Sequence, residues 1–235
     1  MSLLSRLFER SPGLSKEQRD RLARWQALPE PDPALRVEAT RIVVADVESS
    51  GLNVITDRLI AIGAVAIVGA KAVIADSFYA VLRQPKPSSP ENILLHGIGG
   101  TEQAEGSDPV EALLGFLAFA GKAPLVGFNS SFDEIMIGKS MQQLLGEPFR
   151  RSWIDLAWLA PSVLPDEAKA TRGLDGWLAH FGITVSARHH ALADSLATAQ
   201  LFLVLAARAR EMRIATLGAI REAAESMRWI ARSRR

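Results

Sequence analysis

The chain has 235 residues, of which 48% are hydrophobic and 23% charged, a composition typical of a globular protein with a sizeable core. It contains no cysteine, which excludes disulfides, thiolate zinc sites and cysteine nucleophiles. The formal net charge of +1 neither indicates nor excludes a nucleic-acid partner. We expect one central domain at residues 41–207, with helical extensions at residues 1–40 and 208–235.

No segment of the sequence predicts an association with a membrane. The first ten residues are too short and too interrupted by charge for a secretory signal. No later stretch supplies the ~20 uninterrupted apolar residues that span a bilayer. We therefore expect a cytoplasmic location and no membrane partner.

The two extensions differ in charge. Near the N-terminus, Ser15 to Gln18 has the spacing of a capping box, and Leu22 and Trp25 lie on one side of the helix that it opens. Pro29 to Pro33 then ends this helix. Residues 208–235 contain eight arginines and three glutamates, which indicates either attraction to a polyanion or a solvated helix face.

The central domain begins with three strand-like segments. Residues 42–52 form an apolar run that ends in Asp46, Glu48 and a glycine turn. Because alternate side chains of a strand share a face, the two carboxylates point the same way. Residues 58–68 and 71–82 follow, separated only by Gly69 and Ala70, so we expect these two strands to be antiparallel.

After a proline-rich loop, the pattern changes to alternating helices and strands, which predicts an α/β fold with a mixed sheet and helices on its faces. The last helix of the domain is apolar nearly all round and is therefore expected to be buried. The expected elements are a helix capped by Asp108 and ended at Gly121, a strand at 124–128, a loop and helix at 129–145, a short apolar segment at 153–156, and helices at 174–180 and 191–212.

Two further aspartates lie at the starts of helices. Asp133 follows a strand, and its alternative role is a capping carboxylate in a helix that Ser130 opens. Asp194 stands in an apolar helix, where burial without a partner or a metal ion is costly. His189 and His190 precede that helix and are otherwise ordinary cap or surface residues.

Together these residues describe a site made of carboxylate oxygens, which suits Mg²⁺ or Mn²⁺. Two such ions can activate a water and stabilise the leaving oxygen of a phosphodiester. A histidine with a pKa near neutral is suited to take the proton from that water. The residues alone therefore predict a metal-dependent phosphoryl-ester hydrolase.

From about Arg41 to about Ala207 the chain resembles the DnaQ-like 3′–5′ exonucleases of the DEDDh type, which include the proofreading epsilon subunit of bacterial replicative polymerase. Three motifs carry the resemblance in order: Asp46-Val47-Glu48 with the turn to Leu52, Asn129 to Asp133, and His189 with Asp194 after a four-residue interval. The resemblance implies an RNase H-like fold, with a mixed five-stranded sheet flanked by helices.

The resemblance also implies roles for individual residues. Asp46, Glu48, Asp133 and Asp194 are expected to bind two magnesium or manganese ions, and His189 is expected to be the general base. His190 is then a bystander beside the site. The expected product is a nucleoside 5′-monophosphate, released from a strand that ends in a new 3′-hydroxyl.

Substrate contacts are implied for six residues: Ser49, Gly51, Leu52, His96, Phe128 and Asn129. Leu52 is expected against a base, and His96 is otherwise a plain loop histidine. The chain departs from the family pattern at Phe128, where many relatives carry histidine, and at Val47, where threonine or isoleucine is frequent.

The expected substrate is the 3′ end of single-stranded or mispaired DNA. One alternative keeps the chemistry and changes the substrate to RNA 3′ ends or short oligonucleotides, because no residue pattern identifies a reader of the 2′-hydroxyl. Another is a non-catalytic binding module for a DNA polymerase or repair protein, docked through residues 1–40 and 208–235.

Overall fold

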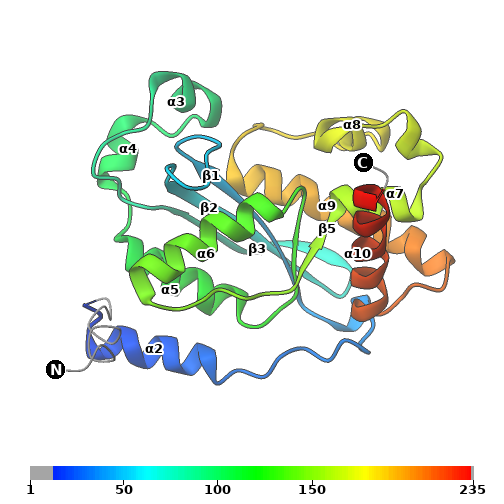
Figure 1. The fold of residues 1–235 in the computed structure, drawn as a ribbon, viewed down its shortest axis with the longest axis horizontal. Coiled ribbons are helices and arrows are strands. Elements are labelled where there is room, and N and C mark those ends of the chain that lie inside the picture. The colour runs from blue at the N-terminus through cyan, green and yellow to red at the C-terminus, as the bar shows by residue number, and fades with distance from the viewer. Residues whose placement is uncertain (1–12, 234–235) are drawn as a thin grey trace.

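The protein is built around one five-stranded sheet with the strand order β3-β2-β1-β4-β5 (Figure 1). Its structure, a computed structural model, describes residues 13–233. Strands β1, β2 and β3 are antiparallel neighbours, and β4 and β5 run parallel to β1. The expected mixed five-stranded sheet is confirmed. The strands are β1 (Ile42–Ser49), β2 (Leu59–Val68), β3 (Lys71–Val81), β4 (Leu125–Gly127) and β5 (Trp153–Asp155).

The hairpin between β2 and β3 is as tight as its sequence predicts. Gly69 and Ala70 have φ angles of +58° and +57°. Positive φ at both central residues belongs to the two-residue turn whose twist matches that of the flanking strands. With this short link, the two long strands pair along most of their length.

Helices cover both faces of the sheet, and residues of β1 point alternately to each face. Val43, Ala45 and Val47 pack with α5 and α6, whereas Ile42 and Val44 pack with α7, α9 and α10. The helices are α2 (Lys16–Gln26), α3 (Pro90–His96), α4 (Gly100–Glu105), α5 (Pro109–Ala120), α6 (Ser131–Leu145), α7 (Leu156–Val163), α8 (Gly173–His180), α9 (Ala191–Glu211) and α10 (Leu217–Ser233), with short 3₁₀ turns at Val37–Ala39 and Glu167–Lys169.

The predicted helix caps explain where several helices begin. Asp108 accepts hydrogen bonds from the backbone N–H groups of Val110 and Glu111, and Ser15 and Gln18 form the predicted capping box. Between Pro90 and Glu105 the structure adds α3 and α4, which the sequence did not predict. Ser89 caps α3 and Pro90 occupies its first turn, so a local start signal is present in the proline-rich segment.

Helix α9 is the core helix of the domain. Its buried side includes Asp194, Thr198, Leu201 and Leu205, whereas Leu192, Leu196 and Leu203 are only partly buried. Within residues 13–233, α9 is also the one helix long and apolar enough to cross a membrane, and half of its apolar window is buried inside the protein. Its buried half packs in the core of the domain.

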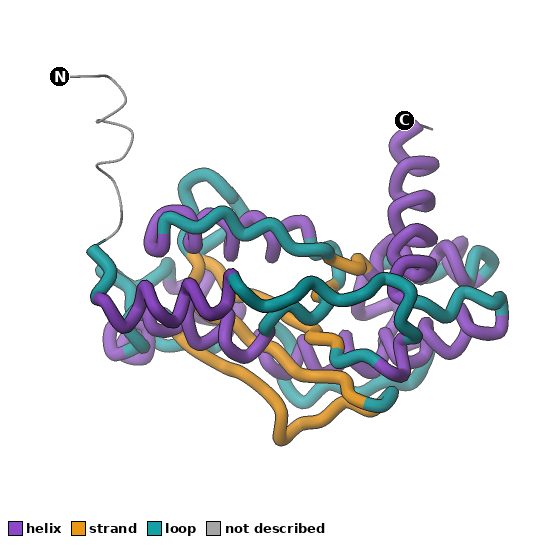
Figure 2. The backbone as a smooth tube through the Cα atoms, turned by 90° about the horizontal axis from the view of Figure 1, so that it is seen from below, coloured by secondary structure: helices purple, strands orange, loops and turns teal. Residues whose placement is uncertain are grey.

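Both extensions pack against the central domain. On α2, Trp25 is buried, and its ring N–H donates to the carbonyl of Gly121 at 2.7 Å. On α10, Leu217 and Ile220 join the same core as β1 and α9. The far end of α10 projects from the body of the molecule (Figure 2). The division at residues 40 and 207 stays a prediction, and residues 1–12 and 234–235 lie outside the described part of the chain.

Candidate active site

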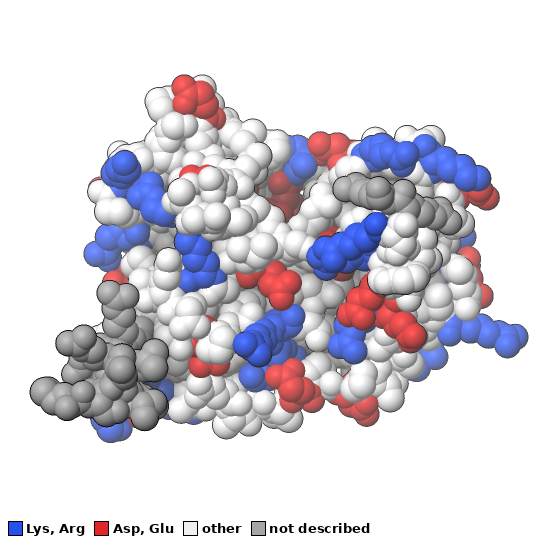
Figure 3. Space-filling model, viewed as in Figure 1, with Lys and Arg blue, Asp and Glu red and all other residues white. Residues whose placement is uncertain are grey.

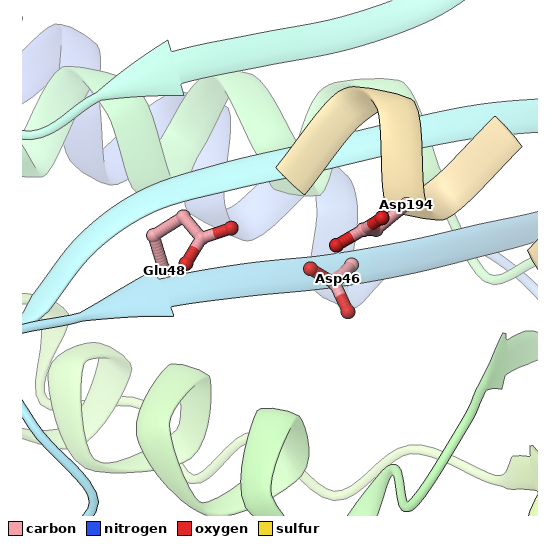
Figure 4. A group of neighbouring side chains, drawn as sticks. All are labelled: Asp46, Glu48 and Asp194. Atoms are coloured by element: carbon pink, nitrogen blue, oxygen red, sulfur yellow. The ribbon is translucent and has the colours of Figure 1, made fainter. Parts of the chain in front are cut away.

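Three of the predicted carboxylates meet at one place. Asp46 and Glu48 project from β1, and Asp194 reaches them from the first turn of α9 (Figure 4). Each residue offers an oxygen that lies within 4.8 Å of the others. Glu48 is 9% exposed and Asp194 is 4% exposed. These two carboxylates are therefore largely removed from water, and Asp46 is partly exposed.

Helix α9 can approach β1 this closely because of Gly63 on β2. Gly63 is the register partner of Asp46. A Cβ at this position would lie 2.3 Å from the backbone carbon of Ala191. Gly63 was not among the predicted residues, although a glycine inside the apolar strand at 58–68 is a signal for close backbone approach.

Asp133 is held against the same strand from the side of α6. Its Oδ1 accepts a hydrogen bond of 3.1 Å from the backbone N–H of Val47. Because β4 ends at Gly127 and pairs with β1 only at Val43 and Val44, that N–H has no ladder partner from β4. The carboxylate thus satisfies a buried backbone donor. Ser130, proposed as the alternative cap, makes no capping hydrogen bond with its side chain.

The close approach of buried carboxylates raises their pKa values. Burial, followed by the charge of Asp194, raises the pKa of Glu48 to about 7. Burial and then the charges of Asp133, Glu48 and Asp194 raise the pKa of Asp46 well above its usual value. Burial likewise raises the pKa of Asp133 to about 8. Such a cluster favours a cation among its oxygens, and the donor set fits a hard divalent ion.

Arg188 supplies positive charge to this cluster and was not predicted from the sequence. Its guanidinium group donates to Asp194 and, through Nε, to Asp175 at 2.6 Å. The second contact comes from α8, so Arg188 joins the loop before α9 to a neighbouring helix. Its place beside His189 and His190 in the sequence is the only signal that could have identified it.

The two histidines have different surroundings. The backbone N–H of His189 donates to Oδ2 of Asp194 at 2.9 Å, and the residue has a φ of +58°. His189 is exposed to solvent. His190 is half-buried and stacks on Tyr79 with ring centroids 4.9 Å apart.

Asp155 organises the turn that leads to Asp133. Its Oδ1 accepts hydrogen bonds from the backbone N–H groups of Asn129 at 2.8 Å and Ala157 at 3.0 Å. Asn129 has a φ of +56°, a left-handed conformation that asparagine tolerates better than most residues. No role was predicted for Asp155 from the sequence, although an aspartate at the end of an apolar segment is a recognisable helix cap.

The segment after β1 is tied down by polar contacts and leaves two large apolar side chains in solvent. The hydroxyl of Ser49 donates to the carbonyl of Gly51 at 2.6 Å, and Asp57 accepts from Ser50 and Asn53. From α6, the Lys139 ammonium group donates to the carbonyls of Val54, Ile55 and Asp57 at 3.2, 2.7 and 2.8 Å. Leu52 is 87% exposed and Ile55 is 81% exposed.

The other expected substrate residues lie in different environments. Phe128 packs partly against the core beside the turn at Asn129. His96 is 3% exposed, its Nδ1 accepts from the Ile98 N–H, and its Nε2 pairs with the side-chain oxygen of Asn92. A substrate contact by His96 stays a prediction, and both of its ring nitrogens are engaged within the protein.

The mixed five-stranded sheet flanked by helices is the RNase H-like fold of exonucleases, and the carboxylate cluster lies between its central strand and α9. The sequence profile of the RNase T family, described as exonuclease, matches residues 43–202, and the chain belongs to this exonuclease family. The predicted relationship to DnaQ-like exonucleases is confirmed.

Relatives in sequence carry the names of replicative polymerase components. The chain is 33% identical over 184 residues to a "DNA polymerase III subunit epsilon-like protein" of Rhodobacter capsulatus, a match that covers 76% of this chain and 25% of the relative. It is 31% identical over 162 residues to a "DNA polymerase III PolC-type" of Thermotoga maritima, covering 68% of this chain and 11% of the relative. The chain thus spans a quarter or less of these proteins.

Solved structures share the fold. A complex of E. coli Exonuclease I with a dT13 oligonucleotide superimposes with a TM-score of 0.63 at 17% identity, covering 74% of this chain and 42% of that one. Exonuclease X bound to 5′-overhanging duplex DNA gives a TM-score of 0.59 at 19% identity, covering 78% of this chain and 99% of the other.

Proposed function

We propose that this protein is a metal-dependent 3′–5′ exonuclease that removes nucleoside 5′-monophosphates from single-stranded or mispaired DNA ends. The observation that supports this most directly is the meeting of Asp46, Glu48 and Asp194, with oxygens within 4.8 Å of one another, in a chain of the exonuclease family. Two structural neighbours were solved with DNA, which favours DNA over RNA as the substrate.

The proposed cofactor is a pair of Mg²⁺ or Mn²⁺ ions held by Asp46, Glu48, Asp133 and Asp194. When bound, such ions lower the pKa of a water and stabilise the leaving oxygen of a phosphodiester. All four side chains offer only oxygen. Burial first, and then the neighbouring negative charges, raise the pKa values of Asp46, Glu48 and Asp133, which supports a cation among these carboxylates.

The remaining roles belong to residues around the carboxylates. A ring nitrogen of His189 accepts the proton of the attacking water, at the rim where its backbone bonds to Asp194. Leu52 contacts the last base, and Ser49 and Gly51 shape the turn that presents it. Phe128 and Asn129 form the opposite wall, next to Asp133.

The test is digestion of labelled single-stranded DNA and RNA of matched sequence, with and without chelator. We expect DNA to be shortened from its 3′ end faster than RNA, and the chelator to abolish release. Asp46→Asn should lower the rate of nucleotide release by more than about a hundredfold. The control Asp20→Asn should leave that rate unchanged, because Asp20 forms only an exposed ion pair with Lys16 on α2. Undiminished release by Asp46→Asn would overturn the mechanism, and faster trimming of RNA would assign the substrate to the alternative class.

A second proposal concerns partners. The names of the sequence relatives favour association with a DNA polymerase, docked through residues 1–40 or 208–235. Capture of purified polymerase by the full chain, compared with exposed-residue variants of α2 and α10, tests it. Equal capture by every variant would exclude these extensions as the docking surface.

A further inference from the structure

Helix α10 carries a row of arginines along one edge. Arg221, Arg228 and Arg232 are separated by seven and four residues, so they share one side of a helix with 3.6 residues per turn. Arg221 donates to the hydroxyl of Ser152 beside β5 at 3.1 Å. Arg228 donates to the hydroxyl of Ser131 at 3.3 Å. The row therefore runs from the edge of the sheet to the first turn of α6.

That first turn belongs to the candidate active site. Ser131 lies two residues before Asp133, and the charge of Arg228 acts on Glu134 and Asp155 at the same end of α6. Asp155 in turn lies close enough to Asp133 for its charge to be felt there. A strand whose 3′ end occupies the carboxylate cluster can therefore reach the arginine row within a few nucleotides.

Part of this positive charge is not matched by ion pairs. Arg221 pairs with Glu225 at 3.6 Å. In residues 13–233, neither Arg228 nor Arg232 takes part in a salt bridge shorter than 4.0 Å. Figure 3 shows basic side chains beside α10 on the side toward the centre of the molecule.

An exposed aromatic side chain accompanies these charges. Trp229 is 70% exposed and stands three residues from Arg232, which makes the two neighbours on the helix surface. Figure 2 shows that this end of α10 projects from the body of the molecule, and the exposed Trp229 side chain is available to a ligand there. A basic groove with aromatic faces is the composition by which proteins bind single-stranded nucleic acid without reading its sequence.

We propose that α10 is a second contact for the substrate strand, in which Arg228 and Arg232 bind phosphates and Trp229 stacks on a base several nucleotides from the 3′ end. We call Arg228, Trp229 and Arg232 the α10 track. The occupant is single-stranded DNA, favoured by charge complementarity and by the position beside the site. The assignment of strand direction rests on the proposed exonuclease function, while binding itself does not.

The experiment measures binding and digestion separately. Binding of labelled oligothymidylates of two and twelve nucleotides is followed by fluorescence anisotropy in chelator, where no hydrolysis occurs. The test variant is Trp229→Ala with Arg232→Gln, both exposed. The matched control is Met212→Ala with Arg208→Gln. Both residues are exposed and lie at the C-terminal end of α9, outside α10.

We expect the test variant to bind the twelve-nucleotide strand about tenfold more weakly and to lose about one unit of salt dependence. In digestion, its KM should rise for the long strand with kcat unchanged, and dinucleotide hydrolysis should be unaffected. An unchanged melting temperature shows that the test variant is folded. The single substitution Trp229→Phe keeps an aromatic ring and should therefore retain most of the binding of the wild type.

The outcomes separate this inference from the proposed function. Weaker binding of the long strand in a protein without exonuclease activity would support the α10 track and refute the exonuclease proposal. Unchanged long-strand affinity in an active enzyme would overturn the track alone. An equal loss with the dinucleotide would also overturn it, because the contact would then be part of the cleavage site. Polymerase capture that depends on Trp229, with DNA binding unchanged, would assign the surface to a protein instead.

Discussion

The hydroxyl of Ser195 donates a hydrogen bond of 2.9 Å to the carbonyl oxygen of Gly63, and this bond joins the first turn of α9 to β2. Gly63 lies opposite Asp46 in the sheet, and Ser195 follows Asp194 in the chain. The contact therefore sets the separation of two carboxylates that come from distant parts of the sequence. It depends on the absence of a side chain at Gly63, because the backbone of α9 occupies that space.

Gly63→Ala is expected to move Asp194 away from Asp46 without removing any of the proposed metal ligands. A new Cβ would lie 2.3 Å from backbone atoms of Ala191 and Leu192, so the start of α9 must move. Overpacking of this kind costs roughly 1–3 kcal/mol, and a misplacement of about 1 Å can reduce catalysis about a hundredfold. Exonuclease rate and Mn²⁺ affinity should both fall, as measured by DNA digestion and by titration calorimetry.

Gly138→Ala is the matched control, since its Cβ would meet only Phe149, at about 3.9 Å. In the interior of α6 this change should be neutral or should stabilise the protein by up to about 1 kcal/mol. Full activity and metal affinity in Gly63→Ala would show that α9 is not held in place by this contact.

The sheet and the order of the site residues were predictable because they depend on local patterns. The tight Gly69-Ala70 link determines that β2 and β3 are antiparallel, and strand alternation determines that Asp46 and Glu48 share a face. Asp108 and Ser15 are cap residues whose effect is confined to one helical turn. Local signals such as a tight turn, strand alternation or a helix cap can be recognised without knowledge of tertiary contacts.

The supporting residues could not be predicted because their roles arise from contacts between distant segments. Arg188 meets Asp175 of α8, and Asp155 meets Asn129 across two parallel strands. Lys139 reaches back to a loop more than eighty residues earlier in the chain. Each is an ordinary polar residue in the sequence, and only the fold brings it to its partner.

Arg188→Gln is expected to lower the stability of the metal-free protein and to increase the stabilisation that added metal provides. The substitution removes the cation beside Asp194, a carboxylate with 6% of its side chain exposed. Loss of one partner of such a pair should lower the free energy of unfolding by roughly 1–3 kcal/mol. Added Mn²⁺ should then raise the melting temperature of the variant more than that of the wild type, because bound metal restores the missing charge.

Arg208→Gln provides the control for Arg188, since it alters an exposed pair with Glu211. Its melting temperature should match the wild type with and without Mn²⁺. If Arg188→Gln responded to Mn²⁺ no more than the wild type, Arg188 and a metal ion would not share the charge of Asp194.

His96 is expected to make stability sensitive to acid. Burial lowers the pKa of His96, and its Nδ1 accepts a backbone hydrogen bond that only the neutral ring can accept. A histidine with a lowered folded-state pKa stabilises the protein above its unfolded pKa of about 6.5 and loses that contribution as the pH falls. The raised pKa values of Glu48 and Asp133 act in the opposite direction in every variant, so the effect of His96 is a difference between proteins. In urea unfolding, the wild type should lose stability relative to His96→Gln as the pH falls below about 6.5.

Asn92→Asp gives an independent check on His96. A carboxylate facing Nε2 at the position of Asn92 favours the protonated ring, so the acid-induced decline should become smaller than in the wild type. Profiles that are identical in all three proteins would contradict the buried neutral state of His96.

Lys139→Met is expected to weaken substrate binding without touching the carboxylate cluster. The ammonium group of Lys139 donates to three carbonyls of the segment after β1, and this segment presents Leu52 and Ile55 to solvent. Methionine keeps most of the aliphatic stem and removes all three donors, so the segment should become mobile. Ordering a mobile segment on binding costs free energy, and we expect KM for single-stranded DNA to rise about tenfold while kcat at saturation changes little.

Lys71→Met is the control, because Lys71 is an exposed lysine at the start of β3. An unchanged KM in Lys139→Met would show that Leu52 and Ile55 do not need a fixed segment to act on the strand.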